Sequence, residues 1–250
     1  MDKIVLMYHC VYKDSGKESG FQNESAFMYK VYVGKFEKEV KSVSEYLAKH
    51  DLPKETVKFT FDDGGISFLT LIAPVLEKYG FKGIFFIATK YIDTSGFLTK
   101  GQIKELANRG HQVASHSHSH PDNIASLEYD IIKQEWNDSC IILERILGHS
   151  VTCASIPNGD SSSYVVQAAR EVGINVLYTS EPTTKEKNLY DVKLVGRYVV
   201  TDDMEVSELM RIITDRRYRR KMKIRYEIIQ VAHKLLGAKY NKIKMMIIKK

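Results

Sequence analysis

The sequence has few cysteines, few prolines and no long apolar run. Its three cysteines, Cys10, Cys140 and Cys153, include no C-x-x-C pair, so neither a disulfide framework nor a thiolate zinc site is predicted. No stretch approaches the roughly 20 apolar residues of a transmembrane helix. With five prolines, 44% hydrophobic and 27% charged residues among 250, and a mean hydropathy of −0.27, the composition excludes a mainly disordered, a collagen-like and a polytopic membrane protein. A globular protein in a reducing compartment is expected.

The beginning of the sequence also lacks the features of a secretory signal. Only five apolar residues, 4–8, stand before His9, whereas a signal peptide needs a longer apolar stretch and a small-residue cleavage site. A cytoplasmic location is therefore expected.

Short apolar or β-branched runs alternate with longer amphipathic stretches, which is typical of an α/β fold. The pattern predicts strands at residues 4–8, 57–61, 83–88, 112–115, 152–156, 175–178 and 193–200, and helices near 36–50, 67–79, 99–109, 124–147, 161–172 and 204–214. Because parallel neighbours need a long crossover, this alternation implies a parallel sheet. The predicted fold is a distorted or incomplete (β/α) barrel of about seven parallel strands. A polar segment, residues 11–35, is expected to be a long surface loop with substrate contacts.

The positive charge is concentrated at the C-terminal end. Residues 211–250 hold 14 lysines or arginines and two acidic residues, whereas the first 210 residues hold 23 lysines or arginines and 29 acidic residues. We therefore expect a barrel domain over residues 1–210 and a basic amphipathic helical segment over 211–250. Such asymmetry suggests an anionic membrane surface or a nucleic acid as partner.

Two adjacent carboxylates, Asp62 and Asp63, follow the predicted strand 57–61 in the sequence T-F-D-D-G-G. Barrel enzymes place catalytic groups at the C-terminal ends of parallel strands, and glycines let the backbone approach a ligand. D-D-G is also common in turns, where one aspartate caps the next helix. The motif alone leaves both interpretations open.

Three of the eight histidines lie within five residues, in S-H-S-H-S-H-P at 115–121. His116 and His120 share a face if this segment forms a helical turn. Two imidazoles and one carboxylate can hold a divalent metal. A solvated polar loop is the alternative, but three histidines at the end of a strand favour a metal site.

A third loop, S-I-P-N-G-D at 155–160, follows the strand 152–156 and is by itself only a turn signal. In the order of its motifs the sequence resembles the polysaccharide deacetylase family, carbohydrate esterase family four. The motifs are T-F-D-D-G, then H-S-x-S-H-P about fifty residues later, then the x-x-P-x-G turn. Y-H-C-V at 8–11 is similar to the Y-H-x-V element of many members. The resemblance covers roughly residues 4–200.

The resemblance implies a site residue by residue. Asp62 matches the catalytic base of the family, and Asp63, His116 and His120 match the ligands of a divalent metal, for which zinc is expected. Such an ion polarises an acetyl carbonyl and lowers the pKa of water, from which Asp62 takes a proton. The backbone N–H of Asn158 is expected to complete an oxyanion hole.

The sequence also departs from the pattern of the family. The third motif commonly begins with an arginine that pairs with the catalytic aspartate, but Ser155 stands there, so the pKa of Asp62 must be set in another way. Arg197 lies in a strand where members often carry an arginine. No L-x-x-H motif supplies the general-acid histidine of the family. His9 and His118 are the available substitutes, and a structural role for either stays open.

The sequence therefore predicts a metal-dependent hydrolase that removes an acetyl group from an N-acetylated sugar, lipid-linked or in an oligosaccharide, during glycan or polysaccharide biosynthesis. The departures leave an alternative, a catalytically weak glycan-binding or scaffolding barrel.

The basic segment 211–250 has an apolar stripe at helical spacing, made of Ile228, Ile229, Ala232, Leu235 and Leu236. The helix either packs this stripe on the barrel or lies on an anionic membrane surface. Nucleic acid is the least favoured partner, because no nucleic-acid motif accompanies the charge. We expect a peripheral membrane protein.

Overall fold

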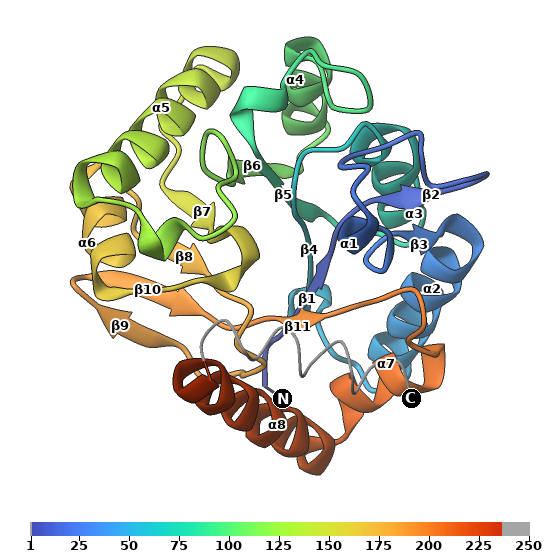
Figure 1. Ribbon diagram of the computed structural model, residues 1–250. Helices are drawn as coiled ribbons and strands as arrows, with labels where there is room; N and C mark the ends of the chain where they lie inside the picture. Colours follow the sequence, from blue (N-terminus) through green and yellow to red (C-terminus); the bar gives the residue numbers. More distant parts are fainter. Residues whose placement is uncertain (1, 237–250) are drawn as a thin grey trace.

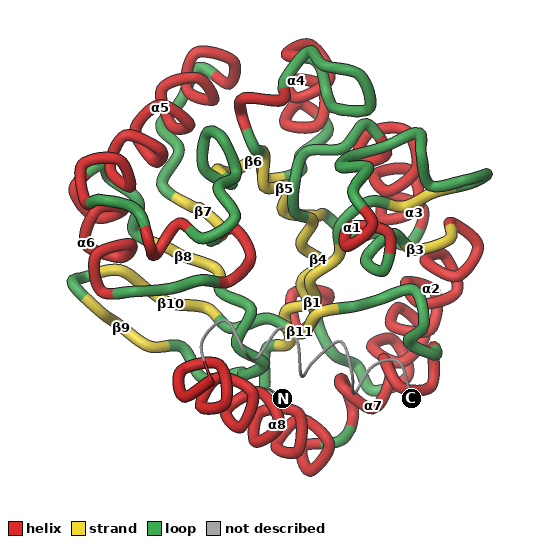
Figure 2. Tube along the Cα trace, in the orientation of Figure 1, coloured by secondary structure: helices red, strands yellow, loops and turns green. Residues whose placement is uncertain are grey.

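The computed structural model describes residues 2–236 of the chain. In this part, nine strands form one curled sheet in the order β11-β1-β4-β5-β6-β7-β8-β10-β9, and helices surround it as a ring (Figures 1 and 2). All neighbouring pairs are parallel except β9 with β10. The predicted incomplete (β/α) barrel is therefore confirmed, with one more parallel strand than expected and one antiparallel strand at its edge.

The strands agree closely with the apolar runs of the sequence. Their bounds are β1 Ile4–Tyr8, β4 Val57–Phe61, β5 Gly83–Ile87, β6 Gln112–Ser115, β7 Cys153–Ser155, β8 Val176–Tyr178, β9 Lys187–Leu189, β10 Val192–Val195 and β11 Tyr198–Val199. The helices are α1 Glu24–Phe27, α2 Val33–Lys49, α3 Ala73–Lys78, α4 Lys100–Asn108, α5 Tyr129–Leu147, α6 Ser163–Glu171, α7 Val206–Thr214 and α8 Arg216–Leu236. A π-helical turn, Phe68–Ile72, precedes α3 and replaces the first part of the helix predicted at 67–79.

The strand predicted at 193–200 is in fact two short strands that pair on opposite sides of the barrel opening. β10 pairs with β8, and β11 pairs with β1, so the chain crosses the opening at Gly196 and Arg197. A side chain at position 196 would bring a Cβ within 2.5 Å of the Glu181 carbonyl oxygen. Glycine is therefore required where the crossing segment passes the loop that follows β8.

The segment 11–35, predicted as a loop, contains its own structure. β2 (Val11–Tyr12) and β3 (Val31–Tyr32) form a second, parallel sheet, and the short helix α1 lies between them. Asn23 caps α1, since its side chain accepts a hydrogen bond from the backbone N–H of Ala26. The segment is held to the barrel by Ser67, whose hydroxyl accepts from the Val11 N–H.

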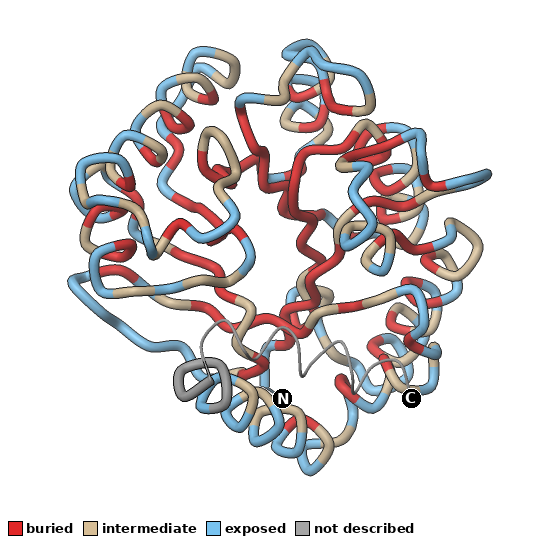
Figure 3. The backbone as a smooth tube through the Cα atoms, viewed as in Figure 1, coloured by how far each residue is buried: buried red, intermediate tan, exposed pale blue. Residues whose placement is uncertain are grey.

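The hydrophobic core has two layers because strand side chains alternate between the faces of the sheet. The larger layer lies between the sheet and its helices and includes the aromatic side chains of Tyr8, Phe59, Phe61 and Phe85. The smaller layer fills the barrel with residues of the opposite alternation, which are Val5, Ile84, Phe86, Ala114, Cys153, Tyr178 and Val195. Figure 3 shows the buried strands inside the exposed outer faces of the helices.

The described part of the basic segment folds as the end of α7 and α8. The predicted domain boundary after residue 210 falls inside α7, whose Leu209, Ile212 and Ile213 are buried in the core. The division into two domains stays a prediction. In the predicted apolar stripe, Ile228 is 64% exposed whereas Ile229 is half-buried. These two side chains therefore lie on different faces of α8. The side chains of Ala232, Leu235 and Leu236 lie outside the described part. Within residues 2–236, no helix has the length and apolar character needed to cross a membrane.

Candidate metal centre

Three loops at the carboxyl ends of β4, β6 and β7 bring the predicted site residues together. Asp62 and Asp63 follow β4, His116 and His120 follow β6, and Asn158 follows β7. These five residues and His9, at the end of β1, line one cavity of about 210 Å³. All six candidates from the sequence therefore share one site, as expected for parallel strands whose carboxyl ends lie at the same end of a barrel.

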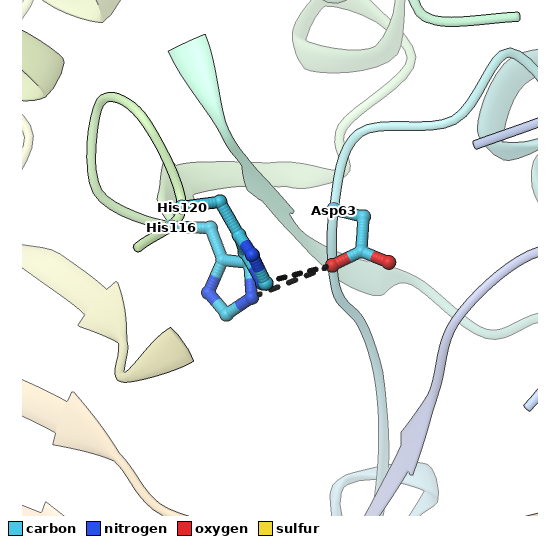
Figure 4. A group of neighbouring side chains, drawn as sticks. All are labelled: Asp63, His116 and His120. Carbon is cyan, nitrogen blue, oxygen red and sulfur yellow. Dashed lines mark ion pairs between the residues drawn. The ribbon is translucent and has the colours of Figure 1, made fainter. Parts of the chain in front are cut away.

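Asp63, His116 and His120 form the cluster expected of metal ligands (Figure 4). Asp63 Oδ1 lies 3.6 Å from His116 Nε2 and 3.5 Å from His120 Nε2. Two ligands about 2.1 Å from one tetrahedral ion lie roughly 3.4 Å apart. The separations are long for direct hydrogen bonds and agree with three ligands that share an ion.

The hydrogen bonds around the cluster favour metal binding. His116 Nδ1 lies 3.0 Å from the carbonyl oxygen of Ser155, so it carries the proton, and Nε2 presents its lone pair to Asp63. Ser117 Oγ accepts from the backbone N–H of His120 at 3.1 Å. The first contact fixes the tautomer of His116 that leaves Nε2 for a metal, and the second holds the backbone of His120 in place.

Glu135 of α5 holds the histidine loop in place. Its carboxylate accepts from the backbone N–H groups of His118 and Ser119 at 3.0 and 2.7 Å. His118 itself has Nδ1 3.0 Å from Thr89 Oγ1 and is absent from the residues that line the cavity. It is therefore part of the loop's support and no substitute for the general acid.

The base candidate Asp62 is bound by Arg197, which was predicted within a strand but lies in the segment between β10 and β11. Arg197 Nη1 donates to Asp62 Oδ1 at 2.7 Å, and Nη2 donates to Oδ2 at 2.8 Å. Ser155 Oγ donates to Asp62 Oδ2 at 3.1 Å and accepts from Arg197 Nη2 at 2.7 Å. Arg197 is fully buried and lies over the rings of Phe86 and Tyr178. It thus supplies the charge that is missing at position 155.

Burial and neighbouring charges give the two adjacent carboxyl groups very different pKa values. Burial alone would raise the pKa of Asp62, but the charge of Arg197 outweighs it and holds that pKa well below its usual range. Burial and the charge of Asp62 raise the pKa of Asp63 to about 8. Burial lowers the pKa of His116 to about 3 and that of His9 to about 4. In the metal-free protein the cluster is therefore neutral beside an ionised Asp62.

His9 lines the cavity beside the metal cluster. Its Nδ1 is buried and has no hydrogen-bond partner among residues 2–236. The ring packs against Tyr29 in a tilted arrangement, with centroids 4.8 Å apart. A buried polar atom without a partner is uncommon in folded proteins, and this distinguishes His9 from the other residues that line the cavity.

The backbone is strained in each of the three site loops. Asp63, Ser117, His120 and Asn158 have positive φ angles of 90°, 62°, 55° and 55°, a region that non-glycine residues rarely adopt. The Asn158 side chain donates to the carbonyl oxygen of Asp122 at 3.1 Å, which anchors the turn. Strain of this kind clusters at functional sites, where the surrounding structure maintains it.

Comparison with protein families agrees with this geometry. Residues 49–177 match the family described as polysaccharide deacetylase. YxkH of Bacillus subtilis is 27% identical over 190 residues, which are 74% of this chain and 68% of YxkH. The peptidoglycan-N-acetylglucosamine deacetylase of Bacillus cereus is 26% identical over 137 residues, which are 54% of this chain and about half (48%) of that relative.

Solved structures share the fold. The deacetylase PplD of Streptococcus pyogenes, in complex with acetate, superposes with a TM-score of 0.68 at 21% identity and covers 85% of this chain and 98% of PplD. IcaB from Ammonifex degensii gives a TM-score of 0.67 at 20% identity, over 84% of this chain and 96% of IcaB. The curled barrel is therefore common to these proteins.

Proposed function

Because this chain belongs to the polysaccharide deacetylase family, whose reaction removes acetyl groups from polysaccharide, we propose that it is a metal-dependent N-deacetylase of an acetylated amino sugar. The observation that carries the proposal is the placement of Asp63, His116 and His120 beside the Asp62–Arg197 ion pair in one cavity. Of the donor sets in proteins, two imidazoles and one carboxylate are typical of catalytic zinc, so zinc is the proposed ion. When bound, the ion would polarise the acetyl carbonyl and make a water molecule more acidic.

Asp62 is the proposed base. Its pairing with Arg197 keeps the carboxylate ionised at neutral pH, so it can accept a proton from the water that attacks the acetyl carbon. The backbone N–H of Asn158 is the proposed donor to the carbonyl oxygen as negative charge develops there, which its position in the lining of the cavity supports. The carbon–nitrogen bond then breaks, acetate leaves, and the sugar nitrogen needs one proton.

His9 is the proposed proton donor to that nitrogen. Its pKa of about 4 keeps the ring neutral, so the ring can accept a proton at one nitrogen and release one from the other. By this relay the proton held by Asp62 reaches the amine with no net change of charge on His9. The unpartnered Nδ1 and the shared cavity support this role.

The proposed substrate is an N-acetylated sugar of a glycan under assembly, in an oligosaccharide or on a lipid carrier. Phe21 and Tyr29 of the segment 11–35 line the cavity and provide apolar walls beside the polar cluster, as in most small-ligand sites. The cytoplasmic location stays a prediction, based on composition.

The test is acetate release from a panel of N-acetylated oligosaccharides, nucleotide sugars and lipid-linked sugars, together with the metal content of each variant. Asp62→Asn should retain metal and lose turnover by about a hundredfold or more. Asp63→Ala should lose metal and turnover together. His9→Asn should retain metal and lose turnover, whereas His149→Asn, at an exposed histidine, should change neither.

Stoichiometric metal without acetate release from any substrate would favour the alternative of a glycan-binding barrel. The lack of an arginine at position 155 was one reason for that alternative. Because Arg197 binds Asp62 instead, this reason no longer applies. Full turnover in Asp62→Asn would refute the assigned base.

A further inference from the structure

The outer face of α8 carries apolar side chains that no part of the described chain covers. Ile224, Ile228 and Val231 are 47%, 64% and 58% exposed. They are four and three residues apart, so they form one stripe along the helix. The opposite face packs on the protein through Tyr218, Arg219 and Met222.

Exposed cations surround this stripe: Arg216, Arg217, Arg220, Lys221 and Arg225. Within residues 2–236 the ion pairs of α8 use its other cations, since Arg219 pairs with Asp2 at 2.9 Å and Lys223 pairs with Glu181 at 3.3 Å. The five exposed cations are therefore available to an anionic partner. We call the stripe and these cations the outer face of α8.

The cations at the start of α8 also line a groove of about 760 Å³. Its other wall consists of Asp2, Tyr198 and residues 182–185. Because Asp2 is paired with Arg219, the groove has an excess of positive charge. A groove with several guanidinium groups suits the phosphate of a lipid headgroup.

The position of α8 leaves the metal cluster accessible. The cluster lies at the centre of the barrel, at the carboxyl ends of β4 and β6, whereas α8 lies at the rim, below β9 and β11 in Figure 1. A surface bound to the outer face would lie along the side of the barrel.

We propose that the outer face of α8 docks the protein on an anionic lipid bilayer. Ile224, Ile228 and Val231 would enter the boundary between headgroups and acyl chains, while the cations bind lipid phosphates. Nucleic acid would use the cations but leave the apolar stripe in water. A symmetric contact with a second copy would place the same cations opposite one another.

The experiment is co-sedimentation of the full chain with vesicles of phosphatidylglycerol and phosphatidylcholine, and with vesicles of phosphatidylcholine alone. The full chain should bind only the anionic vesicles, and a rise in salt from about 0.1 to 1 M should release it, because the Debye length shortens from about 10 to 3 Å. Arg217→Glu/Arg220→Glu/Lys221→Glu should weaken the partition by at least about a hundredfold, since each of the three lost cations is worth about a fivefold factor and the new glutamates are repelled by the anionic surface. Ile224→Ser/Ile228→Ser should weaken it by about tenfold or more.

Matched control variants separate this face from general charge and apolarity. The control for charge makes an equal change of net charge at exposed positions of α2 and α4, in the variant Lys38→Glu/Lys49→Glu/Lys104→Glu. The control for apolarity removes two exposed isoleucines of α5, in the variant Ile131→Ser/Ile141→Ser. Both should sediment like the unchanged chain, with thermal unfolding of every variant as the check on folding. Equal losses in control and test variants, or binding to neutral vesicles, would overturn the proposal. Binding to a single-stranded nucleic acid but not to anionic vesicles, or self-association that the α8 substitutions abolish, would replace it with another partner.

Discussion

Two side chains, one at the end of β7 and one in the segment between β10 and β11, hold the carboxylate of Asp62. Arg197 donates to both of its oxygens and Ser155 donates to one of them, while Arg197 and Ser155 also bind each other. A buried carboxylate without its cation is strongly destabilising. The guanidinium is therefore needed both for the fold and for the ionised state of Asp62.

At the residue scale, we predict that the arginine can be moved between these two positions. Arg197→Ser should lower acetate release by about a hundredfold and lower the melting temperature, because Asp62 loses its buried partner. Ser155→Arg with Arg197→Ser should recover part of both losses, since it returns a guanidinium to Asp62 from the position that the family pattern uses. Acetate release and thermal unfolding measure the two effects separately.

Ser155→Ala is the control, because it removes one hydrogen bond to Asp62 and leaves the charge pair intact. It should cost about 1 kcal/mol of unfolding free energy. A double variant no better than Arg197→Ser in either measurement would show that the position of the arginine matters, and not only its charge.

Most of the site could be predicted from residues that are close in the sequence. Asp62 and Asp63 are adjacent, and His116 and His120 lie in one loop, so the order of parallel strands was enough to bring them together. Arg197 lies 135 positions from Asp62, and its role depends on a strand break that no apolar pattern signals. Glu135 is one acidic residue of many on an amphipathic helix, and nothing in its spacing distinguishes it.

At the scale of elements, the strands were predictable where buried apolar runs are continuous, as in Ile4–Tyr8 and Gly83–Ile87. The run 193–200 was predicted as one strand although Gly196 and Arg197 interrupt its apolar residues. β10 and β11 pair with different neighbours, which is a property of the closed barrel and not of local propensity. The segment 11–35 was predicted as a loop because β2 and β3 have only two residues each. Strands of that length leave no periodic signal.

The packing of α8 depends on one buried cation. Arg219 Nη1 donates to the carbonyl oxygens of Ile212 and Ile213 at the end of α7, at 2.9 and 3.1 Å. Its Nη2 donates to Asp2 at 2.9 Å. A guanidinium at the last carbonyls of a helix satisfies acceptors that have no partner within the helix. Arg219 therefore joins α7, α8 and the start of the chain.

At this scale we predict that Arg219 and Arg220, although adjacent, differ in their effect on stability. Arg219→Met should lower the free energy of unfolding by about 2–3 kcal/mol, because three charge-assisted hydrogen bonds are lost. Arg220→Met should change it by less than about 0.5 kcal/mol, since its side chain is exposed. Urea denaturation in the absence of lipid is the measurement, and equal effects would mean that α8 does not depend on this contact.

At the scale of the whole molecule, the buried Glu39 of α2 connects stability to pH. Its side chain is fully buried, and Oε2 accepts from Tyr8 O–H at 3.0 Å. Oε1 lies 3.7 Å from Lys35 Nζ and has no hydrogen bond within residues 2–236. Burial raises the pKa of Glu39 from 4.5 to about 7, against the opposing charge of Lys35. Between these two values the folded protein retains a proton that the unfolded chain releases, so the free energy of unfolding falls as pH rises through this window.

We therefore predict that Glu39→Gln stabilises the protein at pH 8, by up to about 3 kcal/mol, and has little effect near pH 4. Urea denaturation of metal-free protein across this range is the measurement. Glu37→Gln on the same helix is the control: Glu37 pairs with Lys78 at the surface, so it should leave the slope between pH 5 and 8 unchanged. Parallel pH profiles for the unchanged chain and Glu39→Gln would contradict the prediction.

The crossing at Gly196 and Arg197 has a consequence for how such proteins evolve. Once a guanidinium reaches Asp62 from this crossing, selection no longer needs an arginine at the third motif, and a short hydroxyl such as Ser155 can drift into that position. Descendants of this kind would be discarded as inactive by any search that demands the motif arginine. They should instead be recognised by a glycine followed by an arginine where the chain passes from one side of the barrel opening to the other.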